Sequence, residues 1–168
     1  MAVTAALGRT MFSFVFLAGA LEKWRALRID GADAAIVEAV APALRAMKSS
    51  VSENVGVDLC SMLPSDYACV RIATAMELFG AALFTCGYAL GAKMLLLFTL
   101  GVTPIMHPFW RRAAEGSAIS DEASVGVEMI MFFKNLALAG ALVFWLGMRS
   151  ELAEERQRAA RREKEKSA

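Results

Sequence analysis

The sequence lacks the residues from which most redox and metal sites are built. It contains one histidine, His107, and three cysteines, Cys60, Cys69 and Cys86, which form no CxxC or CxxCH motif. A single histidine excludes a haem held by two histidines, and no spacing of histidine and carboxylates suits a closed metal site. We therefore expect no metal and no haem, and we interpret the cysteines as ordinary apolar packing residues.

Other signatures of catalysis and binding are missing as well. The chain has no Gly-rich phosphate loop and no arrangement of side chains that would activate a nucleophile. Its net charge is only +1, so the overall charge of the protein does not attract a polyanion. We therefore expect no nucleic-acid partner. Without flavin, haem or iron–sulfur ligation the chain alone has no electron path, and any oxidoreductase activity would need a partner.

What the sequence does contain is long apolar stretches. Of its 168 residues 57% are hydrophobic, and the mean hydropathy of +0.47 is too high for an ordinary soluble domain of this length. Four stretches reach the roughly 20 residues of helix that a hydrocarbon core of about 30 Å requires. They are residues 4–24, 67–90, 91–110 and 127–147. We predict an all-α integral membrane four-helix bundle over residues 1–148.

The first stretch lies so near the amino terminus that a signal peptide is an alternative to a spanning helix. Ala18, Gly19 and Ala20 imitate a small-residue cleavage site. Glu22, Lys23 and Trp24 follow at once, and a charged and aromatic group is typical of an interface anchor. We therefore favour a retained helix. Arg9, inside this helix, is interpreted as a side chain that reaches the lipid head groups.

The polar loop after the first span contains one amphipathic helix. Its apolar residues recur every three or four positions, which predicts a single apolar face on a helix too polar to span. They are Ile36, Val37, Val40, Leu44 and Met47. Pro42 should break or kink this helix. We expect it to lie on the membrane surface or to pack over the mouths of the spans, with partner docking as a further alternative.

The second span has one face made of small residues and a carboxylate. This face consists of Ala73, Glu77, Gly80, Phe84, Gly87 and Gly91. Small residues at such spacing let helices approach closely in lipid. Glu77 should therefore face protein, and the short connection to the third span should make the two helices an antiparallel hairpin.

The third span ends at the only histidine. Pro104 and Pro108 flank His107, and each proline removes a backbone donor and disfavours helix in the residue before it, so this end should bend or unwind. Trp110 closes the span. A quinone or a lipid could lie against Trp110 and accept a hydrogen bond from His107.

Counting inward from the two longer loops brings several charged residues to one side of the membrane. At about 1.5 Å per residue, Lys134 lies about 9 Å and Glu77 about 15 Å inside this surface. A charge at such depth is costly unless it is paired or hydrated. We predict a polar cluster in which Lys134 reaches Glu77, while Glu22 reaches Arg71 or Lys23. Its members are Glu22, Lys23, Arg71, Glu77, His107, Lys134 and Asn135.

The predicted cluster has three interpretations. It can consist of packing pairs that fix the order of the helices. It can instead form a site for a small molecule, a quinone or protons, or it can cover residues of a partner subunit.

Residues 149–168 form a charged tail with acidic residues ahead of basic ones at helical spacing, which predicts a solvated helix. By the positive-inside rule both termini should face the cytosol-like side.

The order of these motifs resembles the DoxX-like four-helix membrane family, and more closely its HR-like lesion-inducing branch. The residues that carry the resemblance are Gly8-Arg9, Gly19, Glu22-Lys23, Glu77 to Gly80, His107 to Trp110, and Lys134 to Leu138 with Gly140. The resemblance implies a four-helix bundle. It leaves the activity open, because the family includes small subunits of quinone-linked oxidoreductases, lesion-associated proteins and accessory subunits of larger membrane complexes.

Residues and resemblance together favour a non-catalytic accessory or scaffold subunit of a larger, energy-transducing membrane complex. The alternatives are a quinone-associated membrane subunit of an oxidoreductase, and a small transporter or proton pathway through Glu77 and Lys134. The expected partners are membrane lipids and other membrane-protein subunits, and quinone or lipid are the ligands considered. The expected location is an organelle inner membrane, mitochondrial or plastid.

Overall fold

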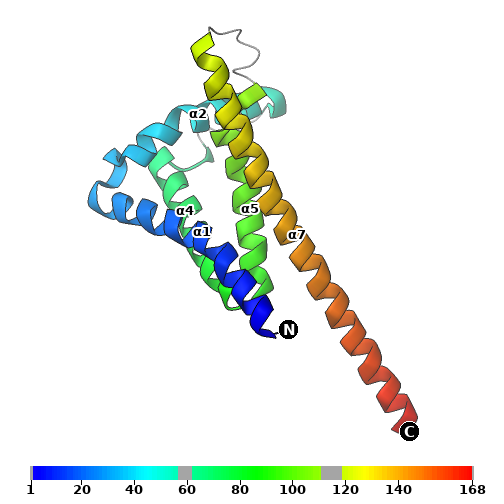
Figure 1. The fold of residues 1–168 in the computed structure, drawn as a ribbon. Coiled ribbons are helices and arrows are strands. Elements are labelled where there is room, and N and C mark those ends of the chain that lie inside the picture. The colour runs from blue at the N-terminus through cyan, green and yellow to red at the C-terminus, as the bar shows by residue number, and fades with distance from the viewer. Residues whose placement is uncertain (1, 57–61, 111–118, 168) are drawn as a thin grey trace.

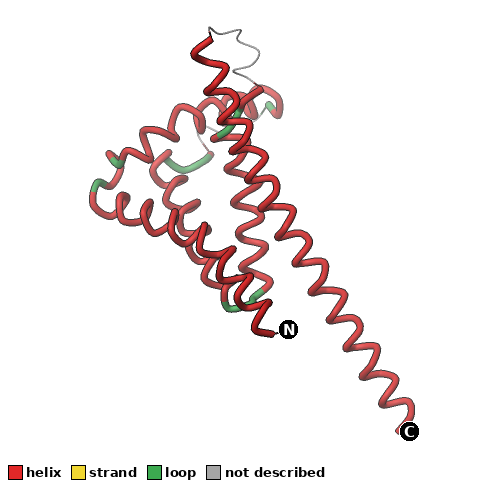
Figure 2. Tube along the Cα trace, in the orientation of Figure 1, coloured by secondary structure: helices red, strands yellow, loops and turns green. Residues whose placement is uncertain are grey.

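The computed structural model describes residues 2–56, 62–110 and 119–167, and these residues contain helices and no strand. The prediction of an all-α chain is confirmed. The helices are α1 (Ala2–Ile29), the short 3-10 helix η1 (Gly31–Asp33), α2 (Ala35–Val55), α4 (Asp66–Thr85), α5 (Ala89–Met106) and α7 (Ile119–Ser167) (Figure 1). Short turns separate several of them, as Figure 2 shows.

Four of these helices are long and apolar enough to cross a membrane: α1, α4, α5 and the first part of α7. The four predicted spans are therefore confirmed, with shifted ends. The second span stops at Thr85 rather than Leu90, because Gly87 adopts a φ of +87°. The N–H of Gly87 donates to Phe84 O and that of Tyr88 to Leu83 O, which is the Schellman pattern that ends a helix.

The spans pack in a row, with α1 on α4, α4 on α5, and α5 on α7. Near the amino terminus all four contribute to one apolar core, in which Phe16 of α1 and Leu142 of α7 meet Phe84 and Leu95. Away from that end, α1 and α7 diverge in Figure 1. The charged carboxyl-terminal part of α7 continues the span as one helix, extends beyond the other elements and has exposed side chains.

The amphipathic helix α2 lies across the end at which α1 and α7 diverge, and it packs on α4 and α5. Its Val37 lies in a second apolar cluster with Leu27 of α1 and Val70 of α4. The structure thus agrees with packing over the mouths of the spans. α2 runs through Pro42 without ending, so a break at this proline is wrong. Buried residues on both sides of the proline, Val37 and Leu44, hold the helix to its neighbours.

Polar contacts fasten α2 to the start of α4. Arg45 Nε donates to Asp66 Oδ2 at 2.7 Å, and Lys48 Nζ lies 3.1 Å from Asp66 Oδ1. Lys48 Nζ also donates to Pro64 O at 3.2 Å. Lys48 is buried, and a buried ammonium needs such partners because it has lost its water. The carboxylate of Asp66 therefore attaches the amphipathic helix to the second span.

Candidate functional site

A charged pair joins the first and second spans. Glu77 of α4 is only 5% exposed, and Lys23 Nζ of α1 lies 2.5 Å from Glu77 Oε2. One turn before Lys23, Gly19 lies beside the same carboxylate, since a Cβ added there would lie 3.6 Å from Glu77 Oε1, an ordinary contact distance. Lys23 Nζ also lies 5.5 Å from the centroid of the Phe98 ring on α5. Three helices therefore surround the pair.

This geometry confirms that Glu77 faces protein, but it corrects the expected partner. Lys23 rather than Lys134 forms the ion pair with Glu77. The physical reason is the helix order: α1 packs along α4, whereas α7 packs on α5 and Lys134 is exposed. Glu22 also does not reach Lys23 or Arg71 in an ion pair; Glu22 and Arg71 are both exposed, and neither makes an ion pair with another described residue.

An apolar cavity of about 390 Å³ adjoins the ion pair. It lies between α2, α4 and α5, and its lining includes Ile36 and Leu44 of α2, Val70 of α4 and Phe98 of α5. Lys23 is the only charged residue among the described residues that line it. A concave apolar site with one polar group is the usual form of a site for a small apolar molecule. The sequence predicted the apolar face of α2 but not which helices it would meet.

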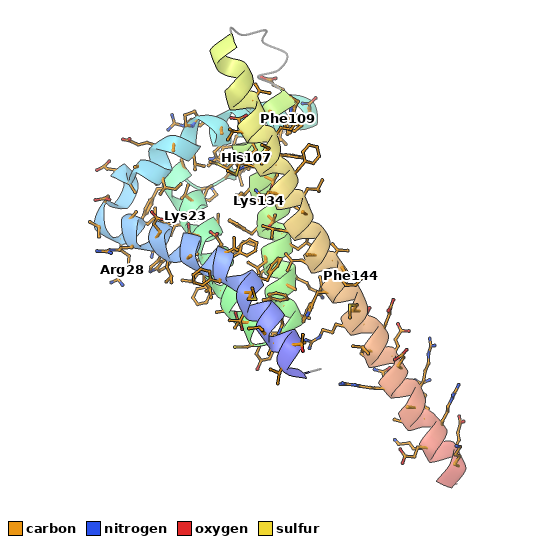
Figure 3. The ribbon with its side chains drawn as sticks, viewed as in Figure 1. Lys23, Arg28, His107, Phe109, Lys134 and Phe144 are labelled. Atoms are coloured by element: carbon orange, nitrogen blue, oxygen red, sulfur yellow. The ribbon has the colours of Figure 1, made fainter. Side chains whose placement is uncertain are left out.

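Other members of the predicted cluster gather at the end of α5. The helix ends at Met106 and His107 takes φ −128° and ψ 61°, with its N–H donating to Thr103 O at 3.0 Å. The predicted unwinding between Pro104 and Pro108 is thus confirmed. Figure 3 shows the side chains of His107 and of Lys134 on α7 toward the same end of the molecule.

An aromatic group and a second cavity complete this end of α5. The ring of Phe109 lies 5.2 Å from Trp110 and 5.3 Å from Phe132 of α7, measured between centroids. A cavity of about 220 Å³ is lined by Trp110 and Asn135, together with Thr103 and Pro104. His107 does not line this cavity among the residues described, so Trp110 and Asn135 contact it while His107 lies beside it.

The predicted cluster is therefore divided between separate places. Lys23 and Glu77 form the inner pair, while His107, Lys134 and Asn135 lie at the end of α5 and along α7. Arg71 lines a third cavity, near Arg28 at the far end of α1. Ligand binding by these residues stays a prediction from the sequence.

Metal-binding side chains do not converge within the described segments, where no three of His, Cys, Asp or Glu could hold an ion together. Cys69 is half-buried and its Sγ donates to Pro64 O at 3.4 Å. Cys86 is exposed, so the interpretation as a residue packed within the protein is wrong for this thiol. Cys60 lies outside the described residues.

Comparison with known proteins gives one match. No curated protein and no solved structure matches the chain. The model of the HR-like lesion-inducing family matches residues 1–148, which include all four spans and leave out only the charged tail. The wider relationship to DoxX-like proteins stays a prediction. Four apolar helices and this match together make the protein an integral membrane protein that belongs to the HR-like lesion-inducing family.

Proposed function

We propose that the protein is a non-catalytic accessory or scaffold subunit of a larger, energy-transducing membrane complex. The observation that carries this proposal is the uncovered face of α7. Ala139 and Leu142 are buried against the rest of the chain, whereas the side chains on the opposite face of the same helix are exposed in the described structure. Phe144 on that face is 69% exposed, and its side chain points away from the other helices in Figure 3.

Small residues distinguish this face from one that only contacts lipid. Ala137, Gly140 and Ala141 are exposed next to each other on it, and a Cβ added at Gly140 would meet no atom within 4 Å. In a bilayer, helices associate through close packing at small residues, since burying apolar surface provides little driving force there. The surface of α7 therefore suits a second helix.

Lys134 on the same helix is a charged side chain that needs a stabilising partner. It is exposed and lies about 9 Å inside the loop-side surface at about 1.5 Å per residue. It makes no ion pair with any described residue. An intramembrane ammonium is stabilised by a carboxylate, by water or by reaching the head groups. A partner helix with a carboxylate at this depth would pack against the small residues and neutralise the Lys134 ammonium.

Native gel migration of the tagged full chain, extracted in a mild detergent, tests this proposal. Gly140→Leu should shift the protein from a large assembly to a small one, because the added side chain prevents close approach of a partner helix. Gly8→Leu is the matched control, since Gly8 is also exposed and has no atom within 4 Å of an added Cβ. Unchanged migration of the Gly140→Leu protein would contradict docking through α7.

A quinone-associated membrane subunit is the second candidate function, and the apolar cavity near Lys23 favours it. A quinone ring in this cavity could accept a hydrogen bond from Lys23 Nζ, while its tail lies along α4 and α5. Ala73→Leu would fill the cavity, which Ala73 lines. Quinone extracted with the wild-type protein and lost from this variant would support the candidate, and no quinone in the wild-type protein would remove it.

We also propose an organelle inner membrane, mitochondrial or plastid, as the location. Fractionation of cells that express the tagged chain tests this directly, and recovery in the endoplasmic reticulum or the plasma membrane would contradict it.

A transporter or proton pathway through the Lys23–Glu77 pair is tested by flux into proteoliposomes. Absence of flux for the wild-type protein would remove this class.

A further inference from the structure

Two arginines from opposite ends of the chain converge on the turn between α4 and α5. Arg149 of α7 donates from Nη1 to Gly87 O. Arg9 of α1 approaches the same residue, since a Cβ added at Gly87 would lie 3.5 Å from Arg9 Nη2. The turn therefore brings two guanidinium groups to one glycine, although their helices are not packed neighbours in the row of spans.

Neither guanidinium is neutralised within the described part of the chain. No ion pair of Arg9 or Arg149 with a described carboxylate is found. Arg9 Nε is also buried and has no hydrogen-bond partner. Two like charges near one residue repel each other, and a buried donor without a partner costs free energy. An anion between the two arginines would remove both penalties.

The surroundings of the turn are those of a membrane interface. Trp145 packs on Phe84 with centroids 4.9 Å apart, and the Arg149 guanidinium lies 5.3 Å from the Trp145 ring. Tyr88 is largely exposed in the turn itself. Aromatic and basic side chains at the end of apolar spans mark the level of the lipid head groups.

We propose that Arg9 and Arg149 together bind a phosphate group at the α4–α5 turn, namely the phosphate of an anionic phospholipid. The planar guanidinium is suited to phosphate because it donates two parallel hydrogen bonds, and basic pockets between membrane helices are known to suit anionic head groups. The exposed Leu90 and Leu97, one above the other on α5, provide apolar surface for acyl chains. The lipid would tie α1 and α7 to the central hairpin.

Native mass spectrometry of the purified full chain tests the site. The probes are phosphatidylglycerol and phosphatidylcholine with identical acyl chains, added to the detergent-solubilised protein. The wild-type protein should retain phosphatidylglycerol preferentially. Arg9→Gln and Arg149→Gln should each weaken its retention about tenfold, the loss expected for one charge-assisted contact. Arg28→Gln is the matched control, because Arg28 is exposed on the far end of α1 (Figure 3).

Equal retention of the two lipids by the wild-type protein would overturn the proposal, and so would unchanged retention in both variants. Inorganic phosphate forms a third arm: if it raises the melting temperature as much as phosphatidylglycerol does, the source is a soluble phosphate and the lipid assignment is wrong. Should the variants fail to fold, a photoactivatable phosphatidylglycerol on the wild-type protein decides the question. Labelling near Gly87 supports the site, and labelling only elsewhere overturns it.

Discussion

Gly91 of α5 lies against the backbone of α4 at Gly80, so closely that a Cβ added at Gly91 would lie 2.6 Å from Gly80 O and 2.3 Å from Phe84 N. No side chain fits this space without moving one of the two helices. Close packing of this kind is one of the interactions that drive helix association in lipid. The contact therefore fixes the distance between the second and third spans, which together form the centre of the fold.

Gly91→Ala should destabilise the protein by about 2 kcal/mol, since an added methyl group in a filled space forces a backbone shift. Gly101→Ala on the same helix is the control, because its added Cβ meets nothing within 4 Å. That variant should be neutral or stabilised by about 0.5 kcal/mol through helix propensity. Unfolding in mixed micelles of increasing denaturing detergent measures both. Equal stability of the two variants would show that Gly91 is not a packing position.

The sequence predicted those features that depend on local periodicity. The spans, the apolar face of the amphipathic helix and the orientation of Glu77 toward protein each follow from spacing along a single helix, and each is found in the structure. The partner of Glu77 could not be predicted in the same way. The sequence put Lys23 in the interface anchor of the first span and Lys134 nearer the depth of Glu77, whereas the packing of α1 along α4 brings Lys23 to the carboxylate.

The convergence of the two arginines at Gly87 could not be predicted from the sequence either. Arg9 and Arg149 lie on the first and last helices, and their approach to one turn depends on how both helices are inclined against the central hairpin. The only local sign was Gly87 itself, whose freedom to adopt a positive φ marks a helix end. A glycine at that position predicts a turn but says nothing of the side chains that will meet there.

Breaking the Lys23–Glu77 pair from one side should be costly. Lys23→Met leaves a buried carboxylate without its ammonium, and we expect a loss of about 3 kcal/mol, the lower end for a buried pair because the Lys23 side chain is 28% exposed. Lys23→Met combined with Glu77→Leu should recover most of this loss, since no unpaired charge remains. The same detergent unfolding assay completes the double-mutant cycle.

Lys134→Met is the control for this cycle, because Lys134 has the same charge and does not form the ion pair. It should change the free energy of unfolding of the isolated chain by less than about 0.5 kcal/mol. A coupling energy between Glu77 and Lys134 that exceeds the one between Glu77 and Lys23 would contradict the helix order described above.

The attachment of α2 should depend on one carboxylate. Asp66→Asn removes the charge that Arg45 and Lys48 share and leaves the buried Lys48 ammonium poorly paired, so we expect a loss of about 1–3 kcal/mol. Hydrogen exchange should accelerate over α2 more than over α5. Glu38→Gln, at an exposed position of the same helix, should leave exchange unchanged. Uniform acceleration over the whole chain would instead mean that Asp66 supports the fold globally.

Replacing Gly87 by alanine should have two separable effects, one on the backbone of the turn and one on the surroundings of Arg9. A residue with a Cβ at φ +87° costs about 1 kcal/mol in backbone strain, and the added Cβ would also lie against the Arg9 guanidinium. Gly56→Ala isolates the first effect, because Gly56 has a φ of +71° and no atom of the described residues lies within 4 Å of an added Cβ. Gly87→Ala should therefore lower the unfolding free energy about as much as Gly56→Ala does, but its added methyl group beside the Arg9 guanidinium should weaken retention of phosphatidylglycerol. If both alanine variants retain the lipid as the wild-type protein does, Arg9 is not held against the turn, and the glycine serves only to end α4.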